Sequence, residues 1–201
     1  NSPDLQQFGG EVYGGISFTN EEGDDNTDIR GVLNIPIIED KFGIRAVGYR
    51  VKNSGYFKNI AASDPTYSAI ASSFGVSNLA VDQGNVGNDE YVGARLSMLW
   101  KISDELKFSV LYLNQDLEQD GFPEAQLGLE AFEQTRIMFG DAVERGEEFL
   151  VQDTEILNAV FEYDLGWASL LSSSSWNTEI LKEARDIGSF FGGAPIPQYR
   201  A

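Results

Sequence analysis

The stretch that decides the fold is "YVGARLSMLWKISDELKFSVLYLN", residues Tyr91–Asn114. From Val92 to Trp100 every second residue is apolar, and the alternation resumes at Phe108 after the turn "ISDEL". A period of two predicts a β-hairpin with one apolar face. The opposite face carries Arg95 and Ser97. Some apolar layer must therefore cover the first face.

The same alternation recurs along the chain, so we expect an all-β protein: an antiparallel up-and-down meander of about seven strands. In the third segment Arg45 and Arg50 fall on opposite faces, which leaves its orientation open. The expected strands are Gly10–Asn20, Asp28–Ile38, Phe42–Val51, Val92–Trp100, Phe108–Tyr112, Asp153–Leu165 and Trp167–Trp176.

The connections between these strands alternate between short and long. "EDK", "SDE" and Gly166 make the short ones, whereas Lys52–Glu90 and Asp116–Gln152 are long. Short turns at one end and long loops at the other are typical of outer-membrane barrels. Long structureless loops argue against a compact soluble domain. We therefore expect these strands to form part of a larger transmembrane β-barrel with long outer loops, and lipid to cover the apolar face.

Composition narrows the possible functions. The 201 residues carry a formal charge of -18, so we expect no nucleic-acid partner. Cysteine and histidine are both absent, which excludes disulfides, thiolate metal sites and Ser-His-Asp or Cys-His catalysis. No run of about 18 apolar residues predicts a spanning helix, but barrel strands of about ten alternating residues escape such a search. We expect neither an enzyme nor a cofactor.

One acidic segment, Asp24–Gly31, begins like a calcium-binding loop. Ile29 and Ile35 stand where such a loop requires Gly and Glu. We therefore expect a solvated acidic hairpin and no metal site.

Aromatic residues gather near the ends of the expected strands. Trp100, Tyr163 and Trp167 lie by the short turns, whereas Trp176, like Tyr49, Tyr91 and Tyr112, lies toward the long loops. Two belts at the membrane interfaces would explain this placement. The alternative is the general preference of aromatic residues for strands. We predict Trp100, Tyr163, Trp167 and Trp176 as membrane-interface aromatics.

Three segments resemble TonB-dependent receptors of outer membranes. "NIPIIEDK" (Asn34–Lys41), followed by "IRAVGY" and "GYFKN", is similar to the start of their barrel. The hairpin Tyr91–Glu124 and the segment "FEYDLGWASLLSSSSW" (Phe161–Trp176) resemble the strands that follow. The likeness covers roughly Phe8–Trp176. Each motif alone is weak, whereas their order is more specific.

The resemblance implies a fragment of a plugged barrel of about 22 strands. Residues 1–9 would end the plug or linker, 10–176 would form barrel strands and 177–201 would begin an outer loop. Such receptors lie in the outer membrane of Gram-negative bacteria. They take up a scarce solute (a siderophore-iron complex, cobalamin or a glycan) with energy from the TonB complex, which acts through the plug region absent here. The alternatives are a passive porin-like channel, a soluble all-β carbohydrate-binding module and, less favoured, a carboxylate hydrolase.

Polar residues at transmembrane depth nearly always face an interior. We therefore expect six residues to face the lumen and contact the plug or solute, although most such residues only bond their neighbours. In the outer loops we expect aromatic residues to take part in solute recognition, with ordinary loop packing as the alternative, and a helix within Pro123–Met138. The lumen candidates are Arg30, Asn34, Arg95, Ser97, Asn158 and Glu162, and the loop candidates are Tyr56, Phe57, Tyr67 and Phe74.

Overall fold

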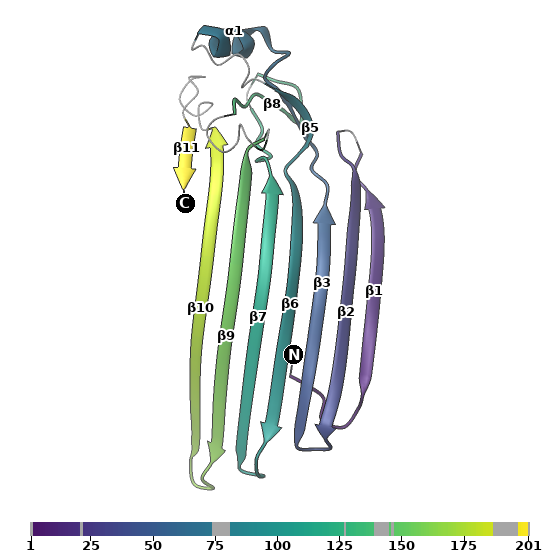
Figure 1. Cartoon of the computed structure of the whole chain (residues 1–201), viewed down its shortest axis with the longest axis vertical. Coiled ribbons are helices and arrows are strands. Elements are labelled where there is room, and N and C mark those ends of the chain that lie inside the picture. The colour runs from purple at the N-terminus through teal and green to yellow at the C-terminus, as the bar shows by residue number, and fades with distance from the viewer. Residues whose placement is uncertain are drawn as a thin grey trace.

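Seven long strands form one antiparallel meander in the computed structural model (Figure 1). The structure describes residues 2–20, 22–73, 81–126, 128–138, 145 and 147–186, and the backbone of 197–200. The expected all-β antiparallel meander of seven strands is confirmed. The strands are β1 (Gly9–Phe18), β2 (Asp25–Ile38), β3 (Phe42–Asn53), β6 (Asn88–Lys101), β7 (Leu106–Asp120), β9 (Phe149–Asp164) and β10 (Ser169–Asp186).

The sheet is open. A short strand, β11 (Pro197–Arg200), pairs with β10 and gives the order β1-β2-β3-β6-β7-β9-β10-β11. No ladder among the described strands joins β1 to β11. β10 also continues past Trp176, where we expected a loop to begin, because β9 starts early at Phe149 and gives β10 a partner as far as Ala184.

The two ends of the sheet differ (Figure 1). At one end, short turns join β2 to β3, β6 to β7 and β9 to β10. We call this the turn end. At the opposite end, the connections 54–87 and 121–148 contribute a second sheet of order β5-β4-β8, and we call this the loop end. Its elements are β4 (Phe57–Ile60), α1 (Pro65–Ser73), β5 (Asp82–Val86) and β8 (Glu133–Gln134).

The helix expected within Pro123–Met138 is not there: the described residues of that stretch form turns and β8. Gly128 and Phe132 have φ angles of 93° and 67°, which interrupt a helix. Helix α1 forms in the other connection. There the Asp64 carboxylate accepts hydrogen bonds from the Thr66 and Tyr67 amides (2.8 and 3.0 Å), and Pro65 takes the first helical position.

Buried apolar side chains lie mainly at the loop end. Met138, Phe149 and Ala184 form the one hydrophobic cluster of buried residues in the described part of the chain. Val81 and Val151 pack against it. The middle of the long sheet has no such cluster on either face among the described residues. No described helix has the length and apolar character needed to cross a membrane.

Candidate functional site

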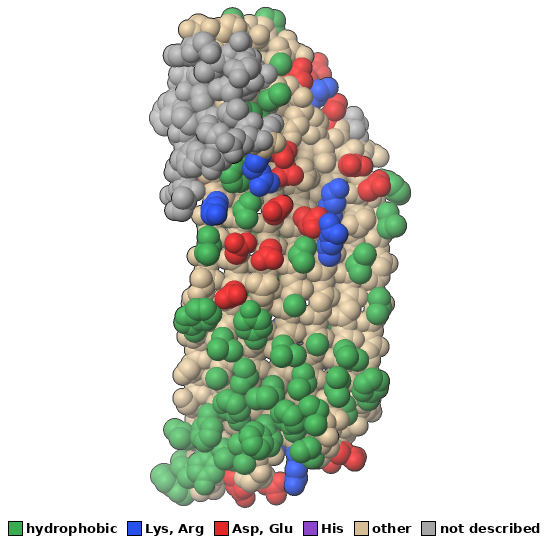
Figure 2. All heavy atoms as spheres, in the orientation of Figure 1, with side chains coloured by type: hydrophobic (Ala, Val, Ile, Leu, Met, Phe, Trp, Pro, Cys, Tyr) green, Lys and Arg blue, Asp and Glu red, His purple; other side chains and the backbone are tan. Residues whose placement is uncertain are grey.

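One face of the long sheet is apolar and exposed. The strand registers place apolar residues from all seven strands on this side: Val12 lies opposite Gly31, Leu33 opposite Ala46, and Leu96 opposite Tyr112. Figure 2 shows these side chains gathered over the part of the sheet nearest the turn end. We call this surface the apolar face. Its large exposed residues are Val12, Ile16, Phe18, Ile29, Leu33, Ile35, Ile37, Val92, Leu96, Trp100, Tyr112, Leu157, Tyr163, Leu170, Trp176 and Ile180.

The apolar residues form a band with an aromatic border on each side. Near the turn end, Trp100 meets Phe42 edge to face, with ring centroids 6.3 Å apart. Tyr163 lies by the same turns, and Trp167 in the β9–β10 turn is 86% exposed. Toward the loop end, Trp176 lies opposite Leu157, on the same rung as Tyr112. At about 3.3 Å per residue, the Trp100 and Trp176 rungs lie about 13 Å apart along the strands. Apolar residues continue about 13 Å further to Val92, which shares its rung with Arg50 and Asp116.

Charged side chains replace the apolar ones immediately above the band. Glu90 lies opposite Glu118, and Asp116 opposite Asp153. Figure 2 shows these charges between the green band and the loop end. Arg50 lies in this charged zone and makes a two-pronged ion pair with Glu90 (2.8 and 2.9 Å). Its place there explains why Arg45 and Arg50 fall on opposite faces of β3, which left the orientation of that strand open in the sequence. The apolar face is therefore bounded and does not run the full length of the strands.

The opposite face, which we call the polar face, carries all six residues predicted for a lumen. The registers bring them to one side: Asn34 lies opposite Arg45, Arg45 opposite Ser97, and Leu111 opposite Asn158. Tyr49 and Tyr91, which we expected in an aromatic belt, also lie on this side, so that expectation is wrong for them. The six residues are Arg30, Asn34, Arg95, Ser97, Asn158 and Glu162.

Three of these six residues bond to neighbouring parts of the chain. Arg30 makes a two-pronged ion pair with Asp28, both contacts 2.6 Å. The Asn158 amide donates to the β10 backbone at Ser174 (3.3 Å) and to the Ser175 hydroxyl (2.6 Å). Asn34, treated next, holds the N-terminal segment. These three residues therefore hydrogen-bond to their neighbours, which is the alternative that we gave to contact with a plug or solute.

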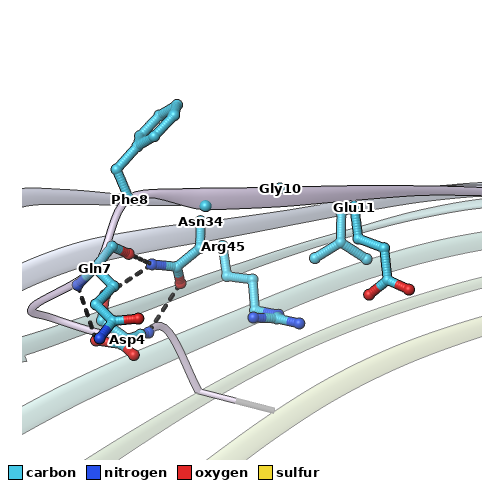
Figure 3. Close-up of a pocket in the computed structure, with 9 residues that line it drawn as sticks. Asp4, Gln7, Phe8, Gly10, Glu11, Asn34 and Arg45 are labelled. Carbon is cyan, nitrogen blue, oxygen red and sulfur yellow. Dashed lines mark hydrogen bonds between the residues drawn. The ribbon is translucent and has the colours of Figure 1, made fainter.

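Residues 2–8 lie across the polar face near the turn end (Figure 3). Asn34 is 5% exposed, and its amide donates to the carbonyls of Asp4 and Gln7 (2.9 and 2.7 Å) while its oxygen accepts from the Asp4 amide (2.8 Å). Leu5 is buried over Gly43, where a Cβ would lie 2.9 Å from the Leu5 side chain. Sequence reasoning placed Asn34 correctly on this face but did not anticipate the segment it holds.

Two hollows open on the polar face beside this segment. One, of about 250 Å³, is lined by Asp4, Gln7, Glu11 and Arg45 among others (Figure 3). The second, of about 170 Å³, brings Ser2 and Pro3 near Ser97 and Asn158. Glu162 borders a separate hollow at the turn end, together with Lys107.

An aromatic cluster occupies the loop end. Tyr56 and Phe57, both predicted for solute recognition, pack with Phe132 at centroid distances of 5.1, 5.8 and 5.7 Å. Tyr56 and Phe132 are exposed. Phe132 has a positive φ angle, and its carbonyl accepts a hydrogen bond from the Lys58 amide (2.8 Å). Strained residues of this kind gather at binding sites.

The two remaining loop candidates do not join that cluster in the described structure. The Tyr67 hydroxyl accepts from the Gln126 side chain (3.1 Å). Phe74 lies outside the described residues. Sequence reasoning missed Phe132 because it lies 75 residues after Phe57, and no local pattern indicates a contact over that separation. The two rings meet because β4 pairs with β8, through Lys58 with Glu133 and Asn59 with Gln134.

A buried ionic network ties the loop end to β9 and β10. Arg136 is 1% exposed and pairs with Glu124 at 2.8 Å, and its Nε lies 3.8 Å from Glu148 Oε2. The Asp186 amide donates to the Glu148 carboxylate, and the Ile137 amide donates to that of Asp186 (3.1 Å). An arginine directly before the apolar pair Ile137 and Met138 was the available sequence signal.

Burial governs the ionisation of these acids. It raises the pKa of Glu148 to about 7; the Asp186 amide and Arg136 favour the carboxylate, whereas the Asp186 charge opposes it. Burial and the nearby Asp120 likewise raise the pKa of Glu147. For Asp82, burial acts to raise the pKa, but hydrogen bonds from Ser63 and the Ala62 amide lower it overall.

Comparisons of the chain with protein-family models, with curated proteins and with solved structures found no match.

Proposed function

We propose that this chain forms part of a transmembrane barrel in the outer membrane of a Gram-negative bacterium, in a transport receptor of the TonB-dependent type. The observation that carries the proposal is the two-faced sheet. A bounded apolar band with aromatic borders lies exposed on one side, and polar residues share the other. Outer-membrane barrels have an apolar band about 25 Å tall between aromatic girdles and a polar interior.

A soluble alternative accounts poorly for the same surface. In a soluble domain, an apolar sheet face is covered by a second layer of helices or strands. Exposed apolar patches on soluble monomers rarely exceed a few hundred Å². Here the band crosses seven strands, and no described element packs on it. Hydrocarbon is the cover that requires no further protein layer.

The exposed edge of β1 sets a condition on the proposal. Unpaired backbone amides and carbonyls in hydrocarbon cost several kcal/mol each. Strands from the rest of a barrel, or from a second copy of this chain in the same bilayer, must therefore pair with both edges of the sheet before it can persist there. The chain by itself would then be unable to transport a solute.

The aromatic cluster at the loop end favours a solute receptor over a passive channel. Tyr56 and Phe132 form an exposed aromatic surface over the buried ring of Phe57, on connections that would face outward as long outer loops. Rings of this kind bind a planar or glycan solute by stacking, and binding residues concentrate on loops carried by a rigid scaffold. The solute would be a siderophore-iron complex, cobalamin or a glycan, and energy would come from the TonB complex.

Two adjacent residues of β9 provide the test, since the chain has no cysteine of its own. Leu157→Cys places a label on the apolar face, and Asn158→Cys places it on the polar face. After refolding into liposomes, we expect a polarity-sensitive label at position 157 to report hydrocarbon and to be quenched by spin-labelled lipid. The label at 158 should report water. The proposal fails if both labels report water in liposomes, or if the chain folds as a monomer in plain buffer with position 157 sealed.

A further inference from the structure

Three groups on the polar face are buried without partners. The Nε atoms of Arg45 and Arg95 and the Oγ of Ser97 have no hydrogen-bond partner in the described part of the chain. Ser97 is only 5% exposed. Buried polar groups are nearly always satisfied, so each exception requires an explanation.

The strand register brings these three residues together. Arg45 lies directly opposite Ser97, and Arg95 lies opposite Val47, two residues along β3 from Arg45. Diagonal neighbours on one face of an antiparallel pair lie about 7–8 Å apart, within reach of long side chains. The two arginines and the serine are therefore neighbours on the polar face, within reach of one another.

These two arginines differ from the rest. The chain carries 32 acidic residues against 14 basic ones, so acidic partners are abundant. No acidic side chain in the described ranges lies within ion-pair distance of Arg45 or Arg95. The other arginines whose side chains are described all have one: Arg30 pairs with Asp28, Arg50 with Glu90, Arg136 with Glu124, Arg145 with Asp120 and Arg185 with Glu124.

The nearest acids are engaged elsewhere or stand apart. Asp4 and Glu11 line the hollow that Arg45 borders (Figure 3). The Asp4 carboxylate accepts from the Gln6 and Gln7 amides (2.8 and 3.1 Å), which fixes it within its own turn. Glu11 makes no ion pair with Arg45. The hollow therefore holds one guanidinium without an ion pair and two carboxylates, one of them fixed in its own turn, and it is open to solvent.

We propose that Arg45, Arg95 and Ser97 form a binding site for a small oxyanion, a carboxylate or a phosphate group on a free solute. A guanidinium presents two parallel N–H groups that match the two oxygens of such a group, and a serine hydroxyl adds a third donor. The bound anion would pair the charges that the fold leaves unpaired. The site deepens the proposed function, on which it rests, because it places an anion-selective step on the wall of the transport path.

The test measures phosphate and citrate binding by calorimetry on the chain refolded in liposomes or detergent. We expect saturable binding that weakens at least about tenfold in Arg45→Gln and in Arg95→Gln, and disappears in the double variant. Ser97→Ala should weaken it less, since one neutral hydrogen bond is lost. Arg50→Gln is the matched control and should leave binding unchanged, because Arg50 lies on the other face and pairs with Glu90.

A second readout separates binding from a structural role. Because both charges are unpaired without a ligand, the glutamine variants should unfold at the same temperature as the parent chain, or higher, in anion-free buffer. The stabilisation of the parent chain by added phosphate should be lost in them. Absence of phosphate and citrate binding to the parent chain, or equal binding by Arg45→Gln and Arg50→Gln, would overturn the proposal.

The same samples report on the proposed function independently. The labels at positions 157 and 158 show whether the sheet has entered the bilayer. Insertion without anion binding defeats only the anion site. If a glutamine variant fails to insert, anion binding is measured on Arg95→Lys and Ser97→Ala instead, because both variants keep the positive charge. Anion binding equal to that of the parent chain in both variants would count against the site.

Discussion

At the scale of single residues, Gly93 illustrates how two strands are fitted together on the polar face. The Tyr49 ring lies over Gly93, and a Cβ there would sit 2.4 Å from the Tyr49 hydroxyl oxygen. That hydroxyl donates to the Gln115 side chain on β7 at 2.6 Å. One tyrosine thus links β3, β6 and β7, and only a glycine at position 93 leaves room for it.

Gly93→Ala should therefore displace Tyr49 and break its bond to Gln115. We expect a loss of about 1–3 kcal/mol in the free energy of unfolding, the usual cost of overpacking. Urea titration in detergent micelles measures it. Gly48→Ala is the control, since nothing lies within 4 Å of a Cβ there. Equal stability of the two variants would contradict the account.

Glu148 should make the loop end less stable as pH rises. Its pKa is about 7 in the folded chain against an ordinary value of 4.5, so the folded state retains a proton that the unfolded state releases. The stabilisation is complete below pH 4.5 and is lost as pH rises through 7. A shift of this size corresponds to roughly 3 kcal/mol. The charged groups facing this carboxyl are Arg136 and Asp186, with Glu124 and Arg185 joined to them.

Glu148→Gln removes this titration while keeping an acceptor for the Asp186 amide. Hydrogen exchange of the Ile137 amide, measured at pH 5 and pH 8 and corrected for the intrinsic rate, should therefore depend less on pH in the variant than in the parent chain. Glu130→Gln, at an exposed carboxyl, should retain the parental dependence. A pH dependence unaltered by Glu148→Gln would refute this assignment.

The residues of the two faces were largely predictable. Alternation alone assigns Arg30, Asn34 and Arg95 to one side of their strands, and the registers agree. Arg45 escaped attention because Arg50 obscured the orientation of β3. The role that we propose for Arg45 depends on where the apolar band ends along the strands and on Ser97 lying opposite Arg45 on β6. The sequence of one strand shows neither feature.

At the scale of elements, the N-terminal segment depends on one side chain. Asn34 makes three hydrogen bonds to residues 4–7, and the Asp40 amide adds a fourth to the Leu5 carbonyl (3.1 Å). These contacts hold an otherwise irregular strip of chain across β2 and β3.

Asn34→Ala should release this segment without melting the sheet, since it removes three hydrogen bonds to the backbone of Asp4 and Gln7. A spin label at Ser2→Cys should become several-fold more mobile in this variant. Asn26→Ala, which also removes side-chain hydrogen bonds but at the loop end, should leave the label unchanged. An immobile label in Asn34→Ala would show that other contacts hold the segment.

The middle of each strand was predictable and the ends were not. β7 continues to Asp120 through "NQDLEQD", and β10 continues to Asp186. Above the apolar band both faces meet polar surroundings, so the hydrophobic period vanishes while the backbone ladder persists. The sequence signal of a strand therefore ends where the band ends.

The short strands of the loop end could not be predicted from local sequence patterns either. β4 and β8 pair in parallel across a long separation, through Lys58 with Glu133 and Asn59 with Gln134. The buried Asn59 side chain holds them together: its oxygen accepts from the Arg136 amide (2.8 Å), and its amide donates to the Arg136 carbonyl (3.1 Å). Such a core has no hydrophobic period to detect.

At the scale of the whole molecule, the sheet separates two environments. One side offers apolar residues from seven strands with aromatic borders, and the other offers arginines, amides and hydroxyls. Proteins that cross lipid with strands require this division. The fold class and the sidedness could be predicted from alternation and from the lengths of the connections. That lipid covers the apolar face is our proposal, and it rests on the energy of leaving that face exposed to water.

The three tryptophans allow the most direct measurement, because all of them lie on the apolar face or at its border: Trp100, Trp167 and Trp176. In liposomes containing lipids brominated at different acyl positions, their intrinsic fluorescence should be quenched most strongly by bromines near the headgroups. Single-tryptophan variants should place Trp100 and Trp176 at different depths, because their rungs lie four residues, about 13 Å, apart along the strands. Quenching of neither residue by any brominated lipid, in a chain that is folded, would contradict a lipid-covered face.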